Sequence, residues 1–187
     1  FNVEAFYWKY ADQQVNYIGP VRTSATTIGS ALITANAGRS RIYGAEAELA
    51  FQLTRADLFS ANLQYLNGKY TDFVFNAYSA TGATPRTSCA VRPNTTVVPT
   101  VAGARVFDVD CSGKPQINSP KWSLNLSYEH VFDIGADYQL TFGGRTKIES
   151  GRFLSPEYLP EERQGSYMQS DLFATFANPT ERWSLTG

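Results

Sequence analysis

The sequence feature that most constrains the fold is the stretch of residues 36–53, in which the two faces differ in character from Tyr43 onward. From Tyr43 to Leu53 every odd position is apolar or aromatic, whereas the even positions include two glutamates and a glutamine. Because successive side chains of a strand point to opposite faces, this stretch predicts one long two-faced β-strand. Helical spacing would scatter the same apolar residues and leave no apolar stripe.

The same alternation recurs along the chain and predicts an all-β, antiparallel fold. Strands are expected at residues 1–12, 36–54, 59–73, 121–132, 138–149 and 168–176, with the start of another at 183–186. The connections between these strands alternate between short and long. The short ones are residues 55–57, 133–136 and 178–182, and the long ones are residues 13–35, 74–119 and 150–165.

Composition narrows the class of protein. With 16 Lys and Arg against 17 Asp and Glu, the net charge of -1 provides no basic excess, so no nucleic-acid partner is expected. No stretch approaches the roughly 18 consecutive apolar residues of a membrane-spanning helix. A membrane β-barrel is compatible with this composition, because barrel strands alternate and their mean hydropathy is modest.

The length of the strands and the two kinds of connection favour a transmembrane β-barrel. Strands of about ten residues are long enough to cross a bilayer at a tilt. Short turns on one side and long loops on the other are the layout of outer-membrane barrels. A soluble β-sandwich also alternates and packs aromatics, but it does not explain the loop asymmetry. Aromatic residues near strand ends are typical of a membrane interface, and here they are Tyr43, Tyr65, Trp122, Phe132, Tyr138 and Trp183.

The number of strands indicates a piece of a larger barrel. Backbone groups in lipid must all be paired, so a spanning sheet has to close on itself. Six strands and the start of a seventh do not suffice, because bacterial barrels are even-numbered and begin at eight strands. The chain also starts at Phe1 inside an expected strand. Residues 1–187 are therefore expected to be part of a single outer-membrane β-barrel domain.

In such a barrel the apolar strand faces meet lipid and the polar faces line a wet or plugged interior. Glu46 and Glu48 lie about 7 Å apart on one face, a spacing that catalytic carboxylate pairs also show. We favour lumen-facing side chains that form ion pairs. The polar residues predicted to face the lumen are Glu46, Glu48, Gln52, Lys121, Glu129, Arg145, Lys147 and Glu149.

Three further residues bear on chemistry. Cys89 and Cys111 share one polar segment with no histidine nearby, which favours a disulfide and an oxidising compartment, with two free thiols as the alternative. His130, the single histidine, falls on an apolar strand face and is interpreted as an interfacial aromatic rather than a base or ligand. No phosphate-binding loop, nucleophile elbow or metal-ligand spacing occurs, so we expect no enzyme activity and no cofactor.

Several strands resemble, in the same order, the later barrel strands of TonB-dependent outer-membrane receptors. The most specific part is the run Asn-Ala-Gly-Arg-Ser-Arg-Ile-Tyr-Gly-Ala-Glu at residues 36–46. The resemblance rests on residues 1–10, 36–49, 62–73, 118–128, the Gly143-Gly144-Arg145 strand and residues 181–185.

The resemblance implies a barrel of about 22 strands in the bacterial outer membrane, with short periplasmic turns and long extracellular loops. It also implies that this chain supplies about the fifteenth strand through the start of the twenty-first. The plug domain and the final strand would lie outside it. The implied partners are outer-membrane lipid, the plug of the same protein, TonB through the N-terminal part, and a small-molecule or metal-chelate ligand.

Receptors of this kind import a scarce ligand, which can be a ferric siderophore, haem, cobalamin or a carbohydrate, with energy relayed by TonB. Two other functions fit the alternation: a small non-transporting outer-membrane barrel with a structural or adhesion role, and a soluble all-β carbohydrate-active or binding domain. Candidate ligand-contacting loop residues, each with simple solvation of a loop tip as the alternative, are Phe73, Phe75, Tyr78, Arg86, Arg92, Tyr158 and Arg163.

Overall fold

Seven antiparallel strands form one long sheet that makes up most of the protein. A computed structural model describes residues 1–187 except 23, 25–27, 97–98, 100, 179 and 181. Each strand pairs with its neighbours in the order β1-β2-β3-β7-β8-β11-β12. The strands are β1 (Asn2–Arg22), β2 (Ile28–Gln52), β3 (Asp57–Asp72), β7 (Trp122–Ile134), β8 (Tyr138–Glu149), β11 (Tyr167–Ala177) and β12 (Ser184–Thr186).

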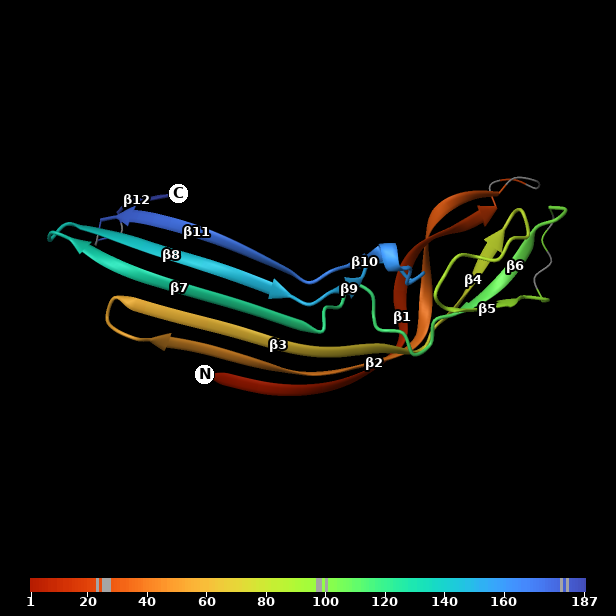
Figure 1. The fold of residues 1–187 in the computed structure, drawn as a ribbon, viewed down its shortest axis with the longest axis horizontal. Helices are drawn as coiled ribbons and strands as arrows, with labels where there is room; N and C mark the ends of the chain where they lie inside the picture. Colours follow the sequence, from red (N-terminus) through yellow and green to blue (C-terminus); the bar gives the residue numbers. More distant parts are fainter. Residues whose placement is uncertain (23, 25–27, 97–98, 100, 179, 181) are drawn as a thin grey trace.

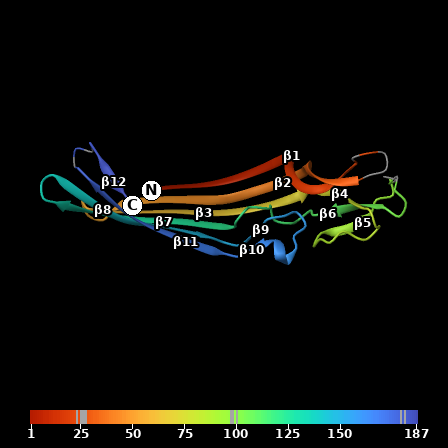
Figure 2. The ribbon, with the colours of Figure 1, turned by 90° about the horizontal axis from the view of Figure 1, so that it is seen from above.

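The sheet is a single layer whose two ends differ (Figures 1 and 2). The ends of β2 and β3, of β7 and β8, and of β11 and β12 that short connections join lie together at one end, and the ends that longer connections join lie at the other (Figure 1). The predicted all-β, antiparallel architecture is confirmed. Among the described residues β1 and β12 do not pair with each other, so the sheet is an open piece of barrel wall.

The strand register keeps polar and apolar side chains on opposite faces of this wall. A row of residues paired across six strands forms part of what we call the polar face: Asn2, Glu48, Asn62, Asn125, Lys147 and Gln169. The neighbouring row on the apolar face consists of Val3, Ala47, Leu63, Leu124, Ile148 and Met168. The alternation in the sequence therefore becomes two continuous surfaces of opposite character.

Aromatic rings border the apolar face at both ends. Tyr138, Phe176 and Trp183 cluster at the short-turn end, with ring centroids 5.3–6.2 Å apart. At the long-loop end the rings of Tyr65 and Trp122 lie 4.6 Å apart. Trp122 and Ile134, the partner of Tyr138 in the register, are twelve residue steps apart on β7, which is about 40 Å along the strand, or about 30 Å across a bilayer at a typical barrel tilt. The apolar band between the rings therefore has the height of a membrane core.

The long connection predicted at residues 13–35 is instead mostly strand. β1 continues to Arg22 and pairs with β2 from Gln13↔Ala37 to Arg22↔Ile28. The prediction failed because this hairpin leaves the two-faced wall and therefore loses its period of two. Asp12 marks the departure: it has no partner in the register and a positive φ of 56°. The pairing resumes in the same register beyond Asp12 and Gly38, so Asp12 adds no residue to β1. The register shifts instead between β2 and β3, where Thr71 is left without a partner between Arg39↔Asp72 and Ser40↔Tyr70, as in a β-bulge.

The connections predicted as loops at residues 74–119 and 150–165 also contain short paired strands. β4 (Val74–Ser79), β6 (Arg105–Asp110) and β5 (Ala90–Pro93) form a three-stranded sheet in the order β4-β6-β5. β9 (Arg152–Phe153) pairs with β10 (Arg163–Gln164) across the short 3-10 helix η1 (Pro160–Glu162). Strands of two to six residues, interrupted by prolines, are too short for periodicity to predict. We call these two segments the loop assembly.

The buried core lies in the loop assembly rather than in the main sheet. Phe73 and Cys111 are 0% exposed and Tyr70 is 2% exposed. Val15, three residues beyond Asp12 on β1, packs in the same cluster and connects β1 to the loops. The full cluster is Val15, Tyr70, Phe73, Phe75, Val109, Cys111 and Tyr158. The predicted disulfide is also present, between Cys89 and Cys111.

Helices contribute little to this architecture. Within the described ranges, no helix is long and apolar enough to cross a membrane.

Substitutions at neighbouring positions of β2 test the assignment of the two faces. Leu49→Arg should destabilise the wall by about 2–4 kcal/mol, because it places a cation on the lipid-facing surface. Glu48→Gln should be tolerated, since its amide oxygen can still accept the hydrogen bond from Asn62 Nδ2 (3.3 Å). Urea unfolding of the barrel in bilayers measures both effects. Normal stability of Leu49→Arg together with failed assembly of Glu48→Gln would reverse the two faces.

Candidate functional site

The polar face carries a groove across four central strands. It has a volume of about 420 Å³ and is open along the sheet. Its lining consists almost entirely of side chains that can form hydrogen bonds, and it includes both acidic and basic residues. The lining residues are Ser60, Asn62, Asn125, Leu126, Ser127, Glu129, Arg145, Thr146, Lys147, Gln169 and Asp171. Such a surface binds water or a polar ligand and offers little for an apolar one.

Charges on this face are balanced by partners within the wall. Glu149 is the most enclosed of them, with a side chain 7% exposed. Its carboxylate lies 2.7 Å from Lys147 Nζ and 2.8 Å from Arg152 Nη1, and accepts a 2.6 Å hydrogen bond from Tyr167 Oη. Arg145 pairs with Glu129 at 3.6 Å. The groove therefore has alternating charge rather than a single sign.

The glutamate pair of β2 is held apart by amides of β3. Gln64 Nε2 donates to Glu46, and Asn62 Nδ2 donates to Glu48 at 3.3 Å. Gln52 donates to the Arg55 carbonyl at the short-turn end (3.4 Å). Each carboxylate thus has its own neutral partner, as expected for a solvated polar wall and not for an acid–base pair that shares a proton.

Lys121 is placed differently from the other residues predicted to face the lumen. It stands at the bend before β7, and its Nζ lies 5.7 Å from the centroid of the Tyr65 ring. Tyr65 belongs to the apolar face, where it packs on Trp122. Alternation misplaces Lys121 because the residue precedes the regular part of the strand. The other seven residues fall on the polar face, and their exposure to a lumen stays a prediction.

Aromatic residues on the polar face lie over glycines of the neighbouring strand. Phe6 is opposite Gly44, and Phe173 is opposite Gly143. A Cβ at Gly143 would come within 2.4 Å of Phe173 Cζ, and one at Gly44 within 2.7 Å of Phe6 Cζ. These two rings break the alternation, and sequence reasoning did not assign them to the site. A glycine opposite an aromatic in the register is the signal that finds them.

The seven candidate ligand contacts separate into two groups. Phe73, Phe75 and Tyr158 are buried in the core of the loop assembly, because the loops fold on themselves instead of extending into solvent. Tyr78 is half-buried, and its Oη has no hydrogen-bond partner among the described residues. The three arginines are exposed: Arg86 pairs with Glu161, whereas Arg92 and Arg163 lie on β5 and β10.

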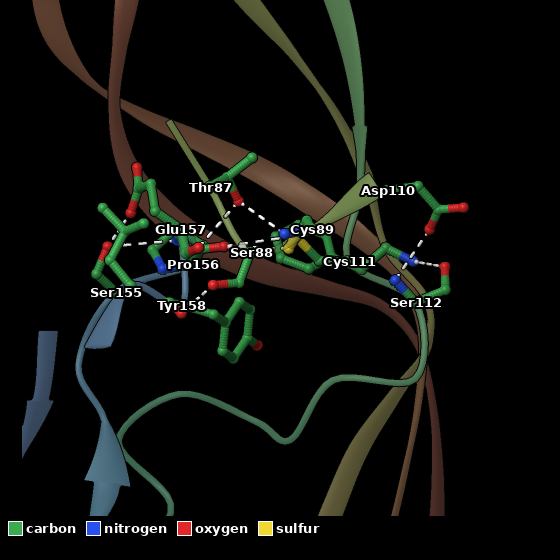
Figure 3. The surroundings of a disulfide bond; sticks show 12 residues. Thr87, Ser88, Cys89, Asp110, Cys111, Ser112, Ser155, Pro156, Glu157 and Tyr158 are labelled. Atoms are coloured by element: carbon green, nitrogen blue, oxygen red, sulfur yellow. Dashed lines mark hydrogen bonds between the residues drawn. A yellow bond between two sulfur atoms is a disulfide. The ribbon is translucent and has the colours of Figure 1, made fainter. Parts of the chain in front are cut away.

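The Cys89–Cys111 disulfide lies against the segment around Pro156, with Cys89 Sγ 3.7 Å and Cys111 Sγ 3.4 Å from the Pro156 carbonyl oxygen (Figure 3). Ser88 N donates to the Glu157 carbonyl (2.8 Å), and Ser88 Oγ donates to the Tyr158 carbonyl (2.7 Å). Tyr158 Oη donates to the Pro115 carbonyl (2.6 Å), and burial raises the pKa of this phenol. Two long connections far apart in sequence are thereby held as one unit.

The pKa values of two carboxyl groups in this unit shift in opposite directions. Burial raises the pKa of the Glu157 carboxyl, and the nearby charge of Glu162 adds to the effect. Hydrogen bonds from Ser112 lower the pKa of Asp110, including one from the Ser112 amide at 2.9 Å. Ionisation of the Glu157 carboxyl therefore destabilises the folded loop assembly.

No group of three His, Cys, Asp or Glu residues that could hold a metal ion occurs among the residues described. His130 lies on the apolar face beside Phe132, with ring centroids 4.2 Å apart, and its Nδ1 is 2.6 Å from Asp57 Oδ1. Asp57 also accepts a hydrogen bond from Tyr128 Oη, so the histidine belongs to a structural network at the short-turn end.

Comparison with known families gives this geometry a context. A family model described as "TonB dependent receptor-like, beta-barrel" matches residues 1–187. The chain belongs to this family. No curated protein and no solved structure matched it.

TonB-dependent receptor barrels are outer-membrane transporters and not enzymes. In a receptor barrel the wall needs one face for lipid and one for the interior, and the strand register of this chain provides both. The resemblance stated from the sequence is confirmed by the family match.

A substitution at Gly143 tests whether the Phe173 ring packs against this glycine of the neighbouring strand. Gly143→Ala should destabilise the wall by about 1–3 kcal/mol, because the new methyl group meets the Phe173 ring. The matched control is Gly165→Ala, since nothing lies within 4 Å of a Cβ there. Urea midpoints of both variants give the comparison. Adding Phe173→Leu should recover part of the loss, and a double variant with fully additive losses would contradict the contact.

Glu157 predicts a pH dependence of the loop assembly. Burial raises the folded-state pKa of Glu157 above its ordinary value of 4.5, so the folded loops favour the protonated form. Their stability should be highest below that value and fall as the pH rises through the window above it. Hydrogen exchange of residues 74–119 and 150–165, from about pH 4 to about pH 8, measures this.

Glu157→Gln should remove the decline, whereas the exposed Glu161→Gln should keep the wild-type profile. If hydrogen-exchange protection of the wild-type loops increased with pH, the expected direction of the pH dependence would be wrong.

Proposed function

We propose that residues 1–187 form part of the wall and the extracellular loops of a TonB-dependent importer in the bacterial outer membrane. It takes up one scarce ligand, which is a ferric siderophore, haem, cobalamin or a carbohydrate. Further strands complete the barrel, a plug domain of the same protein fills it, and TonB supplies energy through the N-terminal part. The chain has no catalytic role.

The continuous polar face is the observation that carries this proposal. Paired polar residues run without interruption from β1 to β11, and the groove among them accommodates solvent or a polar ligand. Glu149 pairs with Lys147, and Glu129 pairs with Arg145, so charges of opposite sign lie next to each other on the polar face. A polar, charge-balanced wall suits contact with a plug domain and with water, because neither side is left with unpaired buried charge.

The loop assembly supports a role in ligand capture. Its hydrophobic core and the Cys89–Cys111 bridge pre-organise an outer surface on which Arg92 and Arg163 are exposed. A bridge that closes a loop with a sequence separation of 22 restricts the unfolded loops by about 3 kcal/mol. Pre-organised loops lose less entropy when they bind a ligand, and so bind more tightly.

A small non-transporting barrel is the second candidate. It would share the two-faced wall, but it does not need a loop assembly with a core of its own. The two open edges at β1 and β12 favour the larger barrel, since in lipid every strand edge must be paired.

Growth on single limiting sources tests import directly. Deletion of the gene should abolish growth on one ligand class among ferric siderophores, haem, cobalamin and carbohydrates, and deletion of tonB should have the same effect. Restoring the gene should restore growth only in cells with TonB. Normal growth of the deletion strain on all four classes, or uptake that continues without TonB, would instead support the small barrel.

Two arginines of the loop assembly test the binding surface once the ligand class is known. For an anionic chelate, Arg92→Ala and Arg163→Ala should each weaken binding by about tenfold, because each removes one charge-assisted contact. Arg55→Ala at the opposite, short-turn end is the matched control. Titration of the ligand against the purified barrel measures affinity. Equal affinity of all three variants would remove these arginines from the site.

A further inference from the structure

Three cations stand side by side on the apolar face of the wall. Lys9 is paired with Arg41, and Arg41 is paired with Lys69, so one row crosses β1, β2 and β3. Neighbouring strands lie about 4.8 Å apart, which places three positive charges within about 10 Å. All three residues are exposed. The row lies at the long-loop end of the apolar face, and we call it the cation row.

The cation row has no counter-charge within the part of the chain that the structure describes. None of its three residues takes part in an ion pair there. The nearest acidic partner along the strands, Asp72, lies 3.7 Å from Arg39 instead. Like charges directly opposite one another destabilise a sheet. An anion from outside the chain would relieve the repulsion between these three cations.

Aromatic rings separate the cation row from the apolar band. Lys9 Nζ lies 5.8 Å from the centroid of the Tyr7 ring, and Arg41 Cζ lies 5.7 Å from that of Tyr43. Lys121 stands in the same relation to Tyr65, at 5.7 Å. Along β1 and β2 the order on this face is therefore cation, aromatic ring and apolar side chain, whereas on β3 Asn67 stands between Lys69 and Tyr65.

A hollow beside the row provides space for a headgroup. Its volume is about 530 Å³, and its walls include Lys9, Arg41, Arg39 and the hydroxyl groups of neighbouring residues. The complete lining is Tyr7, Lys9, Tyr10, Arg39, Ser40, Arg41 and Thr71. Cations and hydroxyls together are suited to phosphate oxygens, which accept several hydrogen bonds at once.

We propose that the cation row binds the headgroup of a lipid that carries more than one phosphate, with its acyl chains along the apolar face below. Charge complementarity selects an anion, and the width of the row favours two phosphates over one. Continuity with the lipid-facing surface selects a lipid over a soluble anion. The assignment to the outer leaflet rests on the proposed function, because it takes the long loops to be extracellular.

The test uses the complete barrel protein in nanodiscs of phosphatidylethanolamine, with or without a bis-phosphorylated glucosamine lipid. Native mass spectrometry counts the bound phosphorylated lipid. The triple variant Lys9→Gln, Arg41→Gln, Lys69→Gln should bind it about 100-fold more weakly, since each cation near the surface contributes about fivefold. The control variant Arg55→Gln, Arg105→Gln, Arg182→Gln removes the same charge elsewhere and should bind like the wild type.

Thermal unfolding gives a second readout. The phosphorylated lipid should raise the Tm of the wild type and leave that of the triple variant unchanged. Without this lipid, the triple variant should be at least as stable as the wild type, because repulsion between like charges is relieved. If the triple variant does not fold, Arg41→Gln alone should show about a fivefold loss of binding.

Two results would overturn the proposal. One is equal lipid binding by the triple variant and the control variant. The other is displacement of the lipid by inorganic phosphate at equal concentration, which would indicate a soluble-anion site. Protease cleavage of residues 74–119 on intact cells tests the proposed function separately. If these loops are not accessible to the protease, the proposed orientation is wrong. The number of bound lipids still reports on the cation row in that case.

Discussion

The structure depends on one constraint: every strand of the wall must be paired in a single register while its two faces meet different surroundings. Side chains alternate with a period of two, so a slip by one residue would turn the apolar residues of a strand to the polar side. Rows such as Asn2–Glu48–Asn62 and Val3–Ala47–Leu63 show that the register is kept from strand to strand. Stability of the wall thus comes from backbone pairing and from the lipid that covers the apolar face, without a buried core between two layers.

The loop assembly solves a different problem, since it stands outside the apolar band and cannot rely on lipid. It therefore folds like a small soluble domain, with a cluster of aromatic side chains and a disulfide. The link between the two parts is the outer half of β1, beyond Asp12. There Val15 packs in the loop core, and Gln13 accepts hydrogen bonds from Ser40 (2.6 Å) and Gln116 (2.7 Å). The hairpin of β1 and β2 is thereby part of both units.

The sequence predicts the wall well and the loops poorly, and the reason is physical. A strand such as β7 has one face in lipid and one in water, so its environment imposes a period of two that can be counted. Short strands inside the loop assembly have no such environment, and Phe73 and Phe75 look like exposed loop aromatics until their burial is seen. The face of Glu46 follows from alternation, whereas its partner Gln64 depends on the register, which a single strand does not contain.

Charged side chains are arranged differently on the two faces. On the polar face Glu149 pairs with two cations and Arg145 pairs with Glu129, so these charges are balanced within the wall. On the apolar face the cations at positions 9, 41 and 69 are in register and have no ion pair within the described chain. Repulsion among them weakens the isolated sheet, and an anion from the surroundings would offset this cost. The row lies beside aromatic rings at the end of the apolar face, and for this reason we propose the phosphate layer of the membrane as the source of that negative charge.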